Sequence, residues 1–281
     1  MSDQMIPSPE GATRLYAVIG DPVTQVLAPR LMNRLFANES IDAVMVPVQA
    51  SAERLSTVVE GLKSMGNCDG ILVTIPHKFA VAHLVERRSG MVELTGAANA
   101  LRRDPDGGWS ADNFDGRGFV TGLLKAGQDL RSRPIILFGA GGAGVAIAAA
   151  LLERGARELH VVDPVPGKAV ALAARLSGRW PGAVNTPALP PLKNAAVVIN
   201  ATPLGLRAED PLPFEPSALS PGTRVADIIM KPAETTLLRE AASFGLPVQP
   251  GIHMLAEQIG LYREFFCLGE EAPIHAFSPV L

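Results

Sequence analysis

One short segment limits the fold of this chain more than any other, the glycine-rich stretch Gly139-Ala140-Gly141-Gly142-Ala143-Gly144. It follows an apolar run, residues 134–138, that is typical of a strand, and it opens an alanine-rich run that is typical of a helix. Such a loop makes a tight turn, brings backbone N–H groups close to an anion and places them at a helix N-terminus. The segment predicts a dinucleotide-binding unit of the Rossmann type. The simpler alternative is a turn of small residues without a ligand, and a P-loop is excluded because no Gly-Lys-Ser/Thr follows.

The acidic residue after the next predicted strand indicates which dinucleotide would bind. Asp163 ends the apolar run at residues 158–162 and lies 24 residues after Gly139. At this place a carboxylate accepts hydrogen bonds from both ribose hydroxyls of NAD but repels the 2′-phosphate of NADP. Since Pro164, Val165 and Pro166 provide no arginine for that phosphate, we expect NAD as the cofactor, with NADP less favoured. The alternative is that Asp163 is an ordinary turn residue at a strand end.

The chain divides into two α/β series, and its 281 residues are enough for two domains. Residues 15–86 alternate short apolar runs with amphipathic ones in a β-α-β-α-β pattern, and a second such series runs from 134 to 244. Between them, residues 95–114 lose this periodicity, and residues 105–108 predict a turn between two short extended segments. Strands that alternate with helices favour parallel sheets with helices on both faces, and a last amphipathic helix is expected over residues 253–266.

The composition argues against several kinds of partner. The 25 basic and 28 acidic residues give a net charge of −3, without a basic run that could neutralise a nucleic acid. Cys68 and Cys267 lack metal-ligand spacing, which argues against a cysteine-based zinc site and favours a reducing compartment, so we expect a cytoplasmic protein. The first 13 residues do not have the basic start and apolar stretch of a signal peptide, and no window is apolar enough to predict a membrane span. No metal-binding or serine-hydrolase motif occurs in the sequence.

Six motifs follow one another in an order and spacing that resemble the shikimate and quinate dehydrogenases: DGILVTIPHK, TGAANALR, DNFDGRGF, GAGGAG, INATPLGL and GIHMLAEQ. The resemblance covers nearly the whole chain. It implies an N-terminal α/β substrate domain, residues 1–114 completed by 251–281, and a Rossmann-type doubly wound dinucleotide-binding domain, residues 115–250. It also implies an oxidoreductase that transfers a hydride between a ring hydroxyl and a nicotinamide cofactor, as in aromatic amino acid biosynthesis. The sequence does not decide whether the protein forms a homodimer.

The resemblance implies a catalytic pair, Lys78 and Asp115. Oxidation of an alcohol removes a hydride from carbon and a proton from oxygen, and a lysine can take that proton when its surroundings favour the neutral amine. A carboxylate alone favours the charged ammonium, so Asp115 is expected to hydrogen-bond the same hydroxyl and to orient Lys78. The sequence leaves open which of the two groups holds the proton. Asn99 and Gln258 match amides that grip ring hydroxyls; Thr74 matches a polar pocket position, although for Thr74 alone generic loop polarity is the better interpretation.

The same motifs imply a set of cofactor-binding residues. They comprise the glycine loop, the acidic residue after the second strand, and positions in the INATPLGL and GIHMLAEQ motifs: Gly139, Ala140, Gly141, Gly142, Ala143, Gly144, Asp163, Thr202, Pro203, Leu204, Gly251 and Met254.

This chain departs from the family pattern in the expected substrate pocket. Family members usually carry two serines in their first motif, whose hydroxyls hold the substrate carboxylate, whereas this chain has Val26 and Ala28. Leu72, Phe114 and Met230 stand where the family usually has Asn, Thr and Tyr. All five replacements are apolar, and they argue against shikimate itself as the substrate. The catalytic pair is nonetheless intact, which random drift in a redundant copy does not predict.

Three hypotheses therefore remain. The first is an NAD-dependent dehydrogenase for a less polar or differently substituted cyclic hydroxy acid or polyol. The second is a genuine shikimate or quinate dehydrogenase whose carboxylate clamp is rebuilt, with Gln25 or Thr24 as the donor. The third is a non-catalytic ligand sensor, since one fold hosts many functions. The intact catalytic pair disfavours the third hypothesis, and the lost serines disfavour the second.

Two histidines near the motifs are less informative. His77 precedes Lys78, and a solvated side chain is its expected state. His253 stands where the family generally has a small residue near the nicotinamide, so that contact with cofactor or substrate and a purely structural place are equal alternatives.

Overall fold

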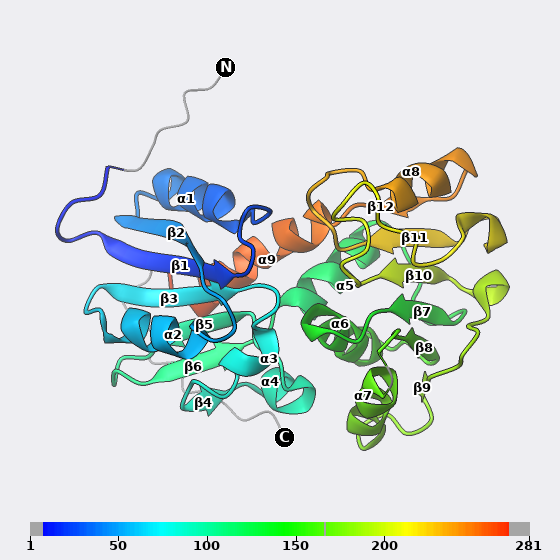
Figure 1. Ribbon diagram of the computed structural model, residues 1–281, viewed down its shortest axis with the longest axis horizontal. Helices are drawn as coiled ribbons and strands as arrows, with labels where there is room; N and C mark the ends of the chain where they lie inside the picture. The colour runs from blue at the N-terminus through cyan, green and yellow to red at the C-terminus, as the bar shows by residue number, and fades with distance from the viewer. Residues whose placement is uncertain (1–7, 166, 270–281) are drawn as a thin grey trace. The chain divides into compact units, whose positions relative to one another are not determined.

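The computed structural model describes residues 8–165 and 167–269 (Figure 1). Two sequence arguments therefore rest in part on residues outside the described ones: the N-terminal segment, through residues 1–7, and Pro166 after Asp163. The chain forms two compact units. Unit 1 contains residues 1–113 and 259–281, and unit 2 contains residues 114–258. Both units are α/β, as the sequence predicts, and each is described by itself below.

Unit 1 is built on a six-stranded mixed sheet with the order β2-β1-β3-β5-β6-β4, which can be followed from top to bottom in Figure 1. Its strands are β1 (Arg14–Gly20), β2 (Ala43–Gln49), β3 (Cys68–Val73), β4 (Arg87–Arg88), β5 (Ala100–Arg103) and β6 (Trp109–Asp112). The predicted parallel pairing is correct for β1 with β2 and β3. β5 is antiparallel to β3 and β6, and the turn predicted at residues 105–108 between two short extended segments lies between β5 and β6. A tight turn causes this: Asp104 N–H donates to the Gly108 carbonyl at 2.8 Å, so β5 returns directly into β6 as a hairpin.

The two faces of this sheet are covered by different helices. Unit 1 contains α1 (Ala28–Asn38), α2 (Leu55–Ser64), α3 (Lys78–Val81) and α4 (Gly90–Thr95). Because side chains alternate along a strand, Ala17 and Ile19 of β1 point into the apolar cluster that includes α2. The Tyr16 ring points the other way. Its centroid lies 5.3 Å from that of Phe36 in α1 and 5.1 Å from that of Phe266, which follows α9 (Ile252–Phe265). The end of α9, the last helix within the described residues, thus covers a face that α2 does not.

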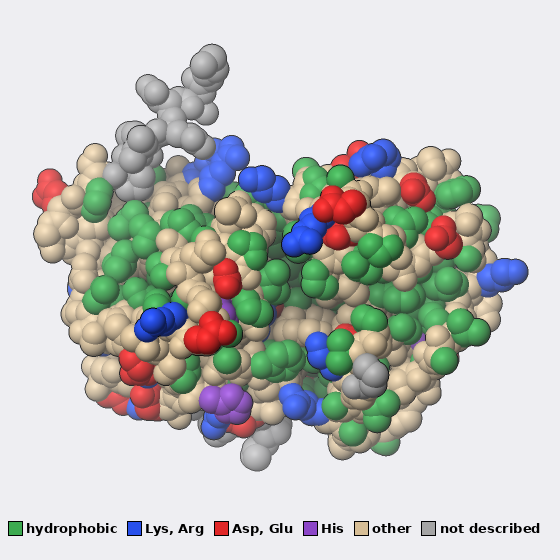
Figure 2. All heavy atoms as spheres, viewed as in Figure 1, with side chains coloured by type: hydrophobic (Ala, Val, Ile, Leu, Met, Phe, Trp, Pro, Cys, Tyr) green, Lys and Arg blue, Asp and Glu red, His purple; other side chains and the backbone are tan. Residues whose placement is uncertain are grey.

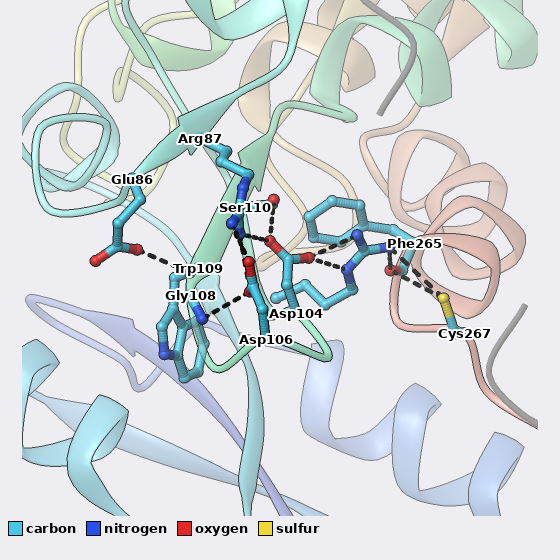
Figure 3. Close-up of polar contacts among 10 residues, drawn as sticks. Glu86, Arg87, Asp104, Asp106, Gly108, Trp109, Ser110, Phe265 and Cys267 are labelled. Carbon is cyan, nitrogen blue, oxygen red and sulfur yellow. Dashed lines mark hydrogen bonds and ion pairs between the residues drawn. The ribbon is translucent and has the colours of Figure 1, made fainter. Parts of the chain in front are cut away.

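A buried carboxylate fixes the end of α9 to this sheet (Figure 3). Asp104 accepts hydrogen bonds from Arg87 Nη1 at 2.7 Å, Ser110 Oγ at 2.5 Å and Arg102 Nη2 at 2.8 Å. Arg102 in turn donates through Nη1 to the Phe265 carbonyl at 2.9 Å, and its guanidinium lies 5.1 Å from the centre of the Phe265 ring. Charge-assisted bonds of this kind are shorter and stronger than neutral ones. The hairpin of β5 and β6 therefore carries the contact that positions the last turn of α9.

Unit 2 is built on a six-stranded parallel sheet with the order β12-β11-β10-β7-β8-β9. Its strands are β7 (Ile135–Phe138), β8 (Leu159–Val162), β9 (Val184–Asn185), β10 (Val197–Asn200), β11 (Arg224–Asp227) and β12 (Val248–Gln249). The chain leaves β7 toward β8 and β9 on one side and returns to β10, β11 and β12 on the other. This is the strand order of a doubly wound dinucleotide fold, and its topological switch point lies between β7 and β10. The predicted Rossmann architecture is confirmed.

The helices of unit 2 are α5 (Asp115–Lys125), α6 (Gly142–Glu153), α7 (Lys168–Ser177) and α8 (Thr236–Ser243), with single 3₁₀ turns at Leu192–Asn194 and Pro216–Ala218. Small residues lie where α5 packs against α6. A Cβ on Gly116 of α5 would lie 2.0 Å from the Ala146 carbonyl oxygen and 2.8 Å from the Ala150 methyl. Small residues on both helices therefore permit a close approach of α5 to α6.

On the face shown in Figure 2, the basic side chains of the described residues are scattered among acidic and apolar ones. No helix in the part of the chain that the structure describes is long and apolar enough to cross a membrane.

Candidate functional site

In unit 1, three strand ends bring the expected substrate residues together. The Asp21 N–H donates to the Ile75 carbonyl at 2.9 Å, and the Thr74 N–H donates to the Ile19 carbonyl at 2.9 Å, so the loops after β1 and β3 lie side by side. The Ala50 N–H after β2 donates to the Gly20 carbonyl at 3.1 Å. Parallel strands present their loops at the same sheet edge, where α/β proteins place ligand sites.

Glycine is required at the end of β1 for this arrangement. A Cβ on Gly20 would lie 2.3 Å from the Thr74 Cγ2 and 3.0 Å from the Ile75 carbonyl oxygen. The absence of a side chain at Gly20 thus lets the Thr74 side chain lie against the first loop.

Lys78 begins α3 just beyond this edge and is buried, with 8% of its surface exposed. Its backbone carbonyl accepts a hydrogen bond from the Ala98 N–H at 2.8 Å, which ties the start of α3 to the TGAANALR segment. The position of the lysine is therefore set by the main chain. A substitution that shortens the side chain leaves this anchor in place.

His77 differs from its sequence expectation. A solvated imidazole is expected, but the side chain is 2% exposed, and its Nε2 lies 2.7 Å from the Ala50 carbonyl oxygen. The expectation was wrong because a polar side chain beside a predicted loop can be satisfied by a carbonyl from a strand that is distant in sequence. His77 joins the loop after β3 to the loop after β2.

Asn99 is fixed on both sides by backbone hydrogen bonds. The Val73 N–H donates to the Asn99 carbonyl at 2.8 Å, and the Asn99 N–H donates to the Asp112 carbonyl at 3.0 Å. The side chain is 2% exposed, and its Nδ2 donates to the Tyr262 hydroxyl at 3.0 Å. Tyr262 is not among the site residues predicted from the motifs. The only signal was its position four residues after Gln258, one helical turn further along α9.

The loop that replaces the family's serine motif offers few side-chain donors. Val26 is half-buried, Ala28 is buried at the start of α1, and Thr24 is exposed. Gln25 uses its Nε2 to donate to the Pro22 carbonyl at 2.8 Å, and its Oε1 is buried without a hydrogen-bond partner among the described residues. At least one amide hydrogen of Gln25 is therefore already engaged within the loop itself.

In unit 2, the two remaining residues expected to contact substrate form a buried pair. Asp115 is the first residue of α5, where the helix dipole favours a carboxylate. It is 3% exposed, and its Oδ1 accepts a hydrogen bond from Gln258 Nε2 at 3.1 Å. A Cβ on Gly118 would lie 2.6 Å from the Met254 carbonyl oxygen, so this glycine allows α9 to approach α5 closely. The glycines in DNFDGRGF thus serve helix packing around Asp115.

The glycine loop has the properties that a pyrophosphate site requires. Gly139 has φ +105°, which only glycine adopts readily, and a Cβ there would lie 2.6 Å from the Ala201 carbonyl oxygen. A Cβ on Gly144 would lie 2.1 Å from the Gly139 carbonyl oxygen, so the loop is closely folded. A Cβ on Gly141 would meet nothing within 4 Å, and this residue caps the N-terminus of α6. The loop thus offers open space beside Gly141 for an anion at the N-terminus of α6.

Asp163 is connected directly to this loop. One carboxylate oxygen accepts a hydrogen bond from the Ala140 N–H at 2.8 Å, and the other accepts one from the Val165 N–H at 2.8 Å. The residue thereby links the end of β8 to the turn after β7. Each carboxylate oxygen has more than one acceptor direction, so these bonds are compatible with a ribose hydroxyl as a further donor.

Thr202, Pro203 and Leu204 lie on the other side of the switch point. The Ala201 N–H donates to the Phe138 carbonyl at 2.7 Å, which places their loop next to the glycine loop. The Thr202 hydroxyl donates to Asn200 Oδ1 at 2.6 Å and accepts from the Leu204 N–H at 3.1 Å. Thr202 thus shapes its own loop.

A buried network underneath this loop was not predicted from the sequence. Asn200 Nδ2 donates to Asp227 Oδ1 at 3.2 Å, and the Thr235 hydroxyl donates to Asp227 Oδ2 at 2.8 Å. The Ile229 N–H also donates to Asp227 Oδ1, at 2.9 Å. Burial raises the pKa of the Asp227 carboxyl, and these hydrogen bonds offset part of that effect. The network joins the carboxyl ends of β10 and β11.

The remaining expected site positions are also placed. A Cβ on Gly251 would lie 2.5 Å from the Ile228 carbonyl oxygen, so the start of α9 abuts the backbone after β11; Met254 is 4% exposed. Leu72 lies buried within β3, and Phe114 is buried in unit 2, where the Arg117 guanidinium lies 5.5 Å from the centre of its ring. Met230 is half-buried and His253 is exposed. Within residues 8–165 and 167–269, no group of three or more His, Cys, Asp or Glu side chains could hold a metal ion.

A doubly wound sheet with a glycine loop at its switch point, joined to a second α/β unit, defines a class of dinucleotide-dependent enzymes. Comparison with known proteins gives the family. Residues 18–101 match the protein-family model that is described as the shikimate dehydrogenase substrate binding domain. The chain is 39% identical over 258 residues to the shikimate dehydrogenase (NADP(+)) of Rubrobacter xylanophilus, covering 90% of each chain.

Solved structures agree with this assignment. The shikimate dehydrogenase of Aquifex aeolicus superposes with a TM-score of 0.84 at 30% identity, covering 94% of this chain and 96% of that one. The ligand-free 5-ketofructose reductase of a Gluconobacter strain superposes with a TM-score of 0.80 at 26% identity, covering 93% and 95% of the two chains. The protein belongs to the shikimate dehydrogenase family of oxidoreductases, and the resemblance stated from the six motifs is confirmed.

Proposed function

We propose that the protein is a nicotinamide-dependent dehydrogenase that transfers a hydride between a ring hydroxyl of a cyclic hydroxy acid or polyol and its cofactor. One observation carries this proposal. The family's two reacting residues are retained as buried polar groups, Lys78 with 8% and Asp115 with 3% of its surface exposed. Burial of an ionisable group costs desolvation free energy, which its hydrogen bonds offset, so retention of both groups in buried positions supports a chemical role for them.

The mechanism follows from the chemistry of these residues. A nicotinamide cofactor, which the glycine loop and Asp163 would hold, would supply the acceptor for the hydride of the carbinol carbon. Lys78, as the neutral amine, accepts the hydroxyl proton and becomes an ammonium ion. Asp115 accepts a hydrogen bond from the same hydroxyl and so orients that hydroxyl. Gln258 Nε2 donates to Asp115 Oδ1 and holds the carboxylate in place. In the reverse direction the ammonium group of Lys78 returns the proton to the forming alkoxide.

Substrate contacts are proposed for the polar residues at the sheet edge of unit 1. Asn99 and Thr74, with Gln258 in unit 2, would bind ring hydroxyls. The loop containing Gln25, Val26 and Ala28 would face the part of the ligand that bears the carboxylate in shikimate. Since neither Val26 nor Ala28 has a side-chain donor, this loop favours a substrate with a less polar group there. The 5-ketofructose reductase among the structural relatives is named for a keto sugar, which supports a range of substrates wider than shikimate in this fold.

For the cofactor, the residues after β8 favour NAD over NADP. The carboxylate of Asp163 would repel a 2′-phosphate, and Pro164 and Val165 carry no charge. Two observations favour NADP instead: the Rubrobacter relative is named as an NADP(+) enzyme, and Lys168 is an exposed cation at the first position of α7. We propose NAD on the strength of the carboxylate. A titration of both cofactors against the parent and against Lys168→Ala decides the matter, because NADP binding through that lysine would fall in the variant.

A second candidate function is shikimate or quinate dehydrogenase itself. The identity of 39% to a shikimate dehydrogenase favours it. This function requires other donors for the substrate carboxylate in place of the two serines. Gln25 is one candidate donor, but one of its amide hydrogens is already bonded to the Pro22 carbonyl. Location in the cytoplasm and the possible homodimer stay predictions from the sequence.

One assay tests whether the protein is a dehydrogenase and which of the proposed substrates and cofactors it uses. The purified protein is incubated with NAD or NADP and with shikimate, quinate, simpler hydroxycyclohexane carboxylates and neutral cyclic polyols, and reduction of the cofactor is followed by absorbance. We expect turnover with at least one member of the panel and poor turnover with shikimate. If no compound is oxidised and no corresponding ketone is reduced, while NAD binds, the ligand-sensor hypothesis replaces the enzyme.

A further inference from the structure

The loop between β1 and α1, residues 21–27, lies beside the segment that carries Lys78. The backbone N–H of Asp21, the first residue of the loop, donates to the Ile75 carbonyl at 2.9 Å, and Ile75 lies three residues before Lys78. The loop therefore lies at the same sheet edge as the proposed proton acceptor. The hydrogen-bonding groups of the loop decide which substituent of a bound ring can lie there.

The Gln25 side chain adds an unsatisfied acceptor to this loop. Its Nε2 donates to the Pro22 carbonyl at 2.8 Å, and because a carbonyl oxygen can only accept, this contact fixes which end of the amide is the nitrogen. The opposite atom, Oε1, is buried without a hydrogen-bond partner among the described residues. The residue as a whole is only half-buried, so rotation about its side-chain bonds can bring Oε1 to a ligand. Val26 and Ala28, the next candidates for contact with the ligand, have no polar side-chain atom.

A negative charge in the same loop disfavours an anionic substituent. Asp21 is half-buried, and its Oδ1 accepts a hydrogen bond from Gln49 Nε2 at 3.0 Å. Gln49 is neutral and does not cancel the charge of this carboxylate, and residues 21–27 include no lysine, arginine or histidine. A substrate carboxylate beside this loop would therefore meet a like charge and an acceptor oxygen, both of which disfavour it.

We propose that this loop binds a neutral hydrogen-bond donor, such as a hydroxymethyl group, at the place where shikimate bears its carboxylate, and that Gln25 selects this donor by accepting its hydrogen bond. The inference rests on the proposed function and narrows its substrate class to neutral cyclic polyols. A hydroxyl can donate to Gln25 Oε1, whereas a carboxylate only accepts and leaves that buried oxygen unsatisfied. The loop thus distinguishes polyols from hydroxy acids by the direction of one hydrogen bond.

The test compares three compounds with the ring of shikimate and one different substituent: the carboxylate itself, a hydroxymethyl group and a methyl group. The first is charged and only accepts, the second is neutral and can donate, and the third is neutral without a polar atom. With the unaltered protein, we expect kcat/KM for the hydroxymethyl compound to exceed that for the methyl compound about five- to tenfold, as for one hydrogen bond. The carboxylate should give the lowest value. A compound that is not oxidised is compared by its inhibition constant against the best substrate of the panel.

Two variants of Gln25 establish the direction of the hydrogen bond. Gln25→Glu keeps an acceptor and has no donor, and Gln25→Met keeps the length of the side chain without either group. Both variants lose the bond to the Pro22 carbonyl, so any effect of loop shape is common to them. We expect Gln25→Glu to keep the preference for the hydroxymethyl over the methyl compound, and Gln25→Met to reduce it to about twofold or less. A preference that survives in Gln25→Met, or that is lost equally in both variants, overturns the role of Gln25.

The comparison of the three compounds needs no variant, so it decides the inference even if a Gln25 variant fails to fold. A hydroxymethyl compound no better than the methyl compound, or a carboxylate that is the best of the three, overturns it. The second result would assign carboxylate binding to the backbone N–H groups at the start of α1 and would leave the dehydrogenase in place. If the protein oxidises no compound of the panel and reduces no corresponding ketone, the proposed function itself fails.

Discussion

The carboxylate of Asp163 accepts a hydrogen bond from the backbone N–H of Ala140 at 2.8 Å. The residue expected to read the cofactor ribose therefore also holds the turn that would bind the pyrophosphate. A change at this position acts on both parts of the cofactor site at once.

Asp163→Asn is expected to weaken NAD binding about fivefold, because an amide has one acceptor oxygen for the two backbone N–H groups that the carboxylate now serves. Combined with Pro164→Arg, it should raise the ratio of NADP to NAD affinity, since repulsion of the 2′-phosphate is removed and a guanidinium is added. Fluorescence titrations with NADH and NADPH measure both effects, and Pro164→Arg alone is the control. An unmoved ratio would show that the ribose is read elsewhere.

Lys78→Ala should fold, bind the cofactor and lose about 10²- to 10⁴-fold in kcat, the range for loss of a general acid or base. The fold should survive because the contact of this residue with Ala98 is made by its backbone carbonyl. Steady-state kinetics with a substrate of the parent, together with a melting curve, check both statements. Full activity in the variant would remove Lys78 from the mechanism.

The double variant Val26→Ser with Ala28→Ser should increase kcat/KM for shikimate, mainly through KM. Two hydroxyl donors to a carboxylate contribute about 3 to 6 kcal/mol at most, or about 10²- to 10⁴-fold in affinity. Ala28 is the first residue of α1, and replacement of one alanine by serine there costs only about 0.5 kcal/mol in helix propensity. Thr24→Ser, on an exposed position of the same loop, is the control. Efficient oxidation of shikimate by the unaltered protein contradicts the premise; no gain in the double variant would assign the barrier to Leu72, Phe114 or Met230.

Asp227→Asn should alter the pH dependence of stability. The folded-state pKa of this carboxyl is raised by burial, so its contribution to stability is complete below the unfolded pKa and is lost as pH rises through the folded pKa. The variant has no such loss. The melting temperature of the variant minus that of the parent should therefore be higher at pH 7 than at pH 4.

Asp210→Asn is the opposite control for that experiment. Hydrogen bonds from the Arg207 and Gly205 N–H groups lower the pKa of the Asp210 carboxyl, so its contribution is present above the unfolded pKa and is lost as pH falls. The melting temperature of this variant relative to the parent should be less favourable at pH 7 than at pH 4. Differences of the same sign in both variants would show that another group dominates the profile.

The two cysteines should react differently with a thiol reagent at pH 8. Burial raises the pKa of the Cys68 thiol to about 11, so little thiolate forms, and the side chain is fully buried within β3. Cys267 is half-buried near the end of the described chain. We expect one thiol to react in the native protein and two after denaturation, with Cys267→Ser abolishing the native signal. Rapid labelling of Cys68 in the native protein would show that β3 opens.

The local features of the fold were predictable because they depend on residues that are close in sequence. Alternating apolar runs indicated most of the strands, and the glycine loop between a strand and a helix indicated the Rossmann unit. The two-residue strands β4, β9 and β12 were not predicted, because two residues carry no periodicity. The turn between β5 and β6 was predicted from residues 105–108, but the antiparallel pairing of β5 with β3 was not, because sequence alternation does not specify pairing across a sheet.

The candidate site shows the same contrast between features that depend on neighbouring residues and features that depend on residues far apart in the sequence. Motif matching predicts Lys78, Asp115 and Asn99 as site residues, because each lies in a motif of contiguous residues. It did not find Tyr262, which reaches Asn99 across 163 residues of sequence. The burial of His77 was likewise not predicted, since its partner, the Ala50 carbonyl, belongs to another strand end. Polar residues that satisfy one another across the fold leave no pattern along the chain.

The division of unit 1 into two pieces of chain has a consequence for the order of folding. During synthesis, residues 114–258 follow the first piece directly, so all of unit 2 is available before residue 259 is added. Until then the Tyr16 ring lacks its contact with Phe266, and Gly70, where a Cβ would lie 2.5 Å from the Phe266 ring, lacks that ring as a neighbour. Part of one apolar face of unit 1 therefore stays exposed while unit 2 is synthesised and folds. A chain that stalls before residue 266 would present that face to chaperones or to other nascent chains.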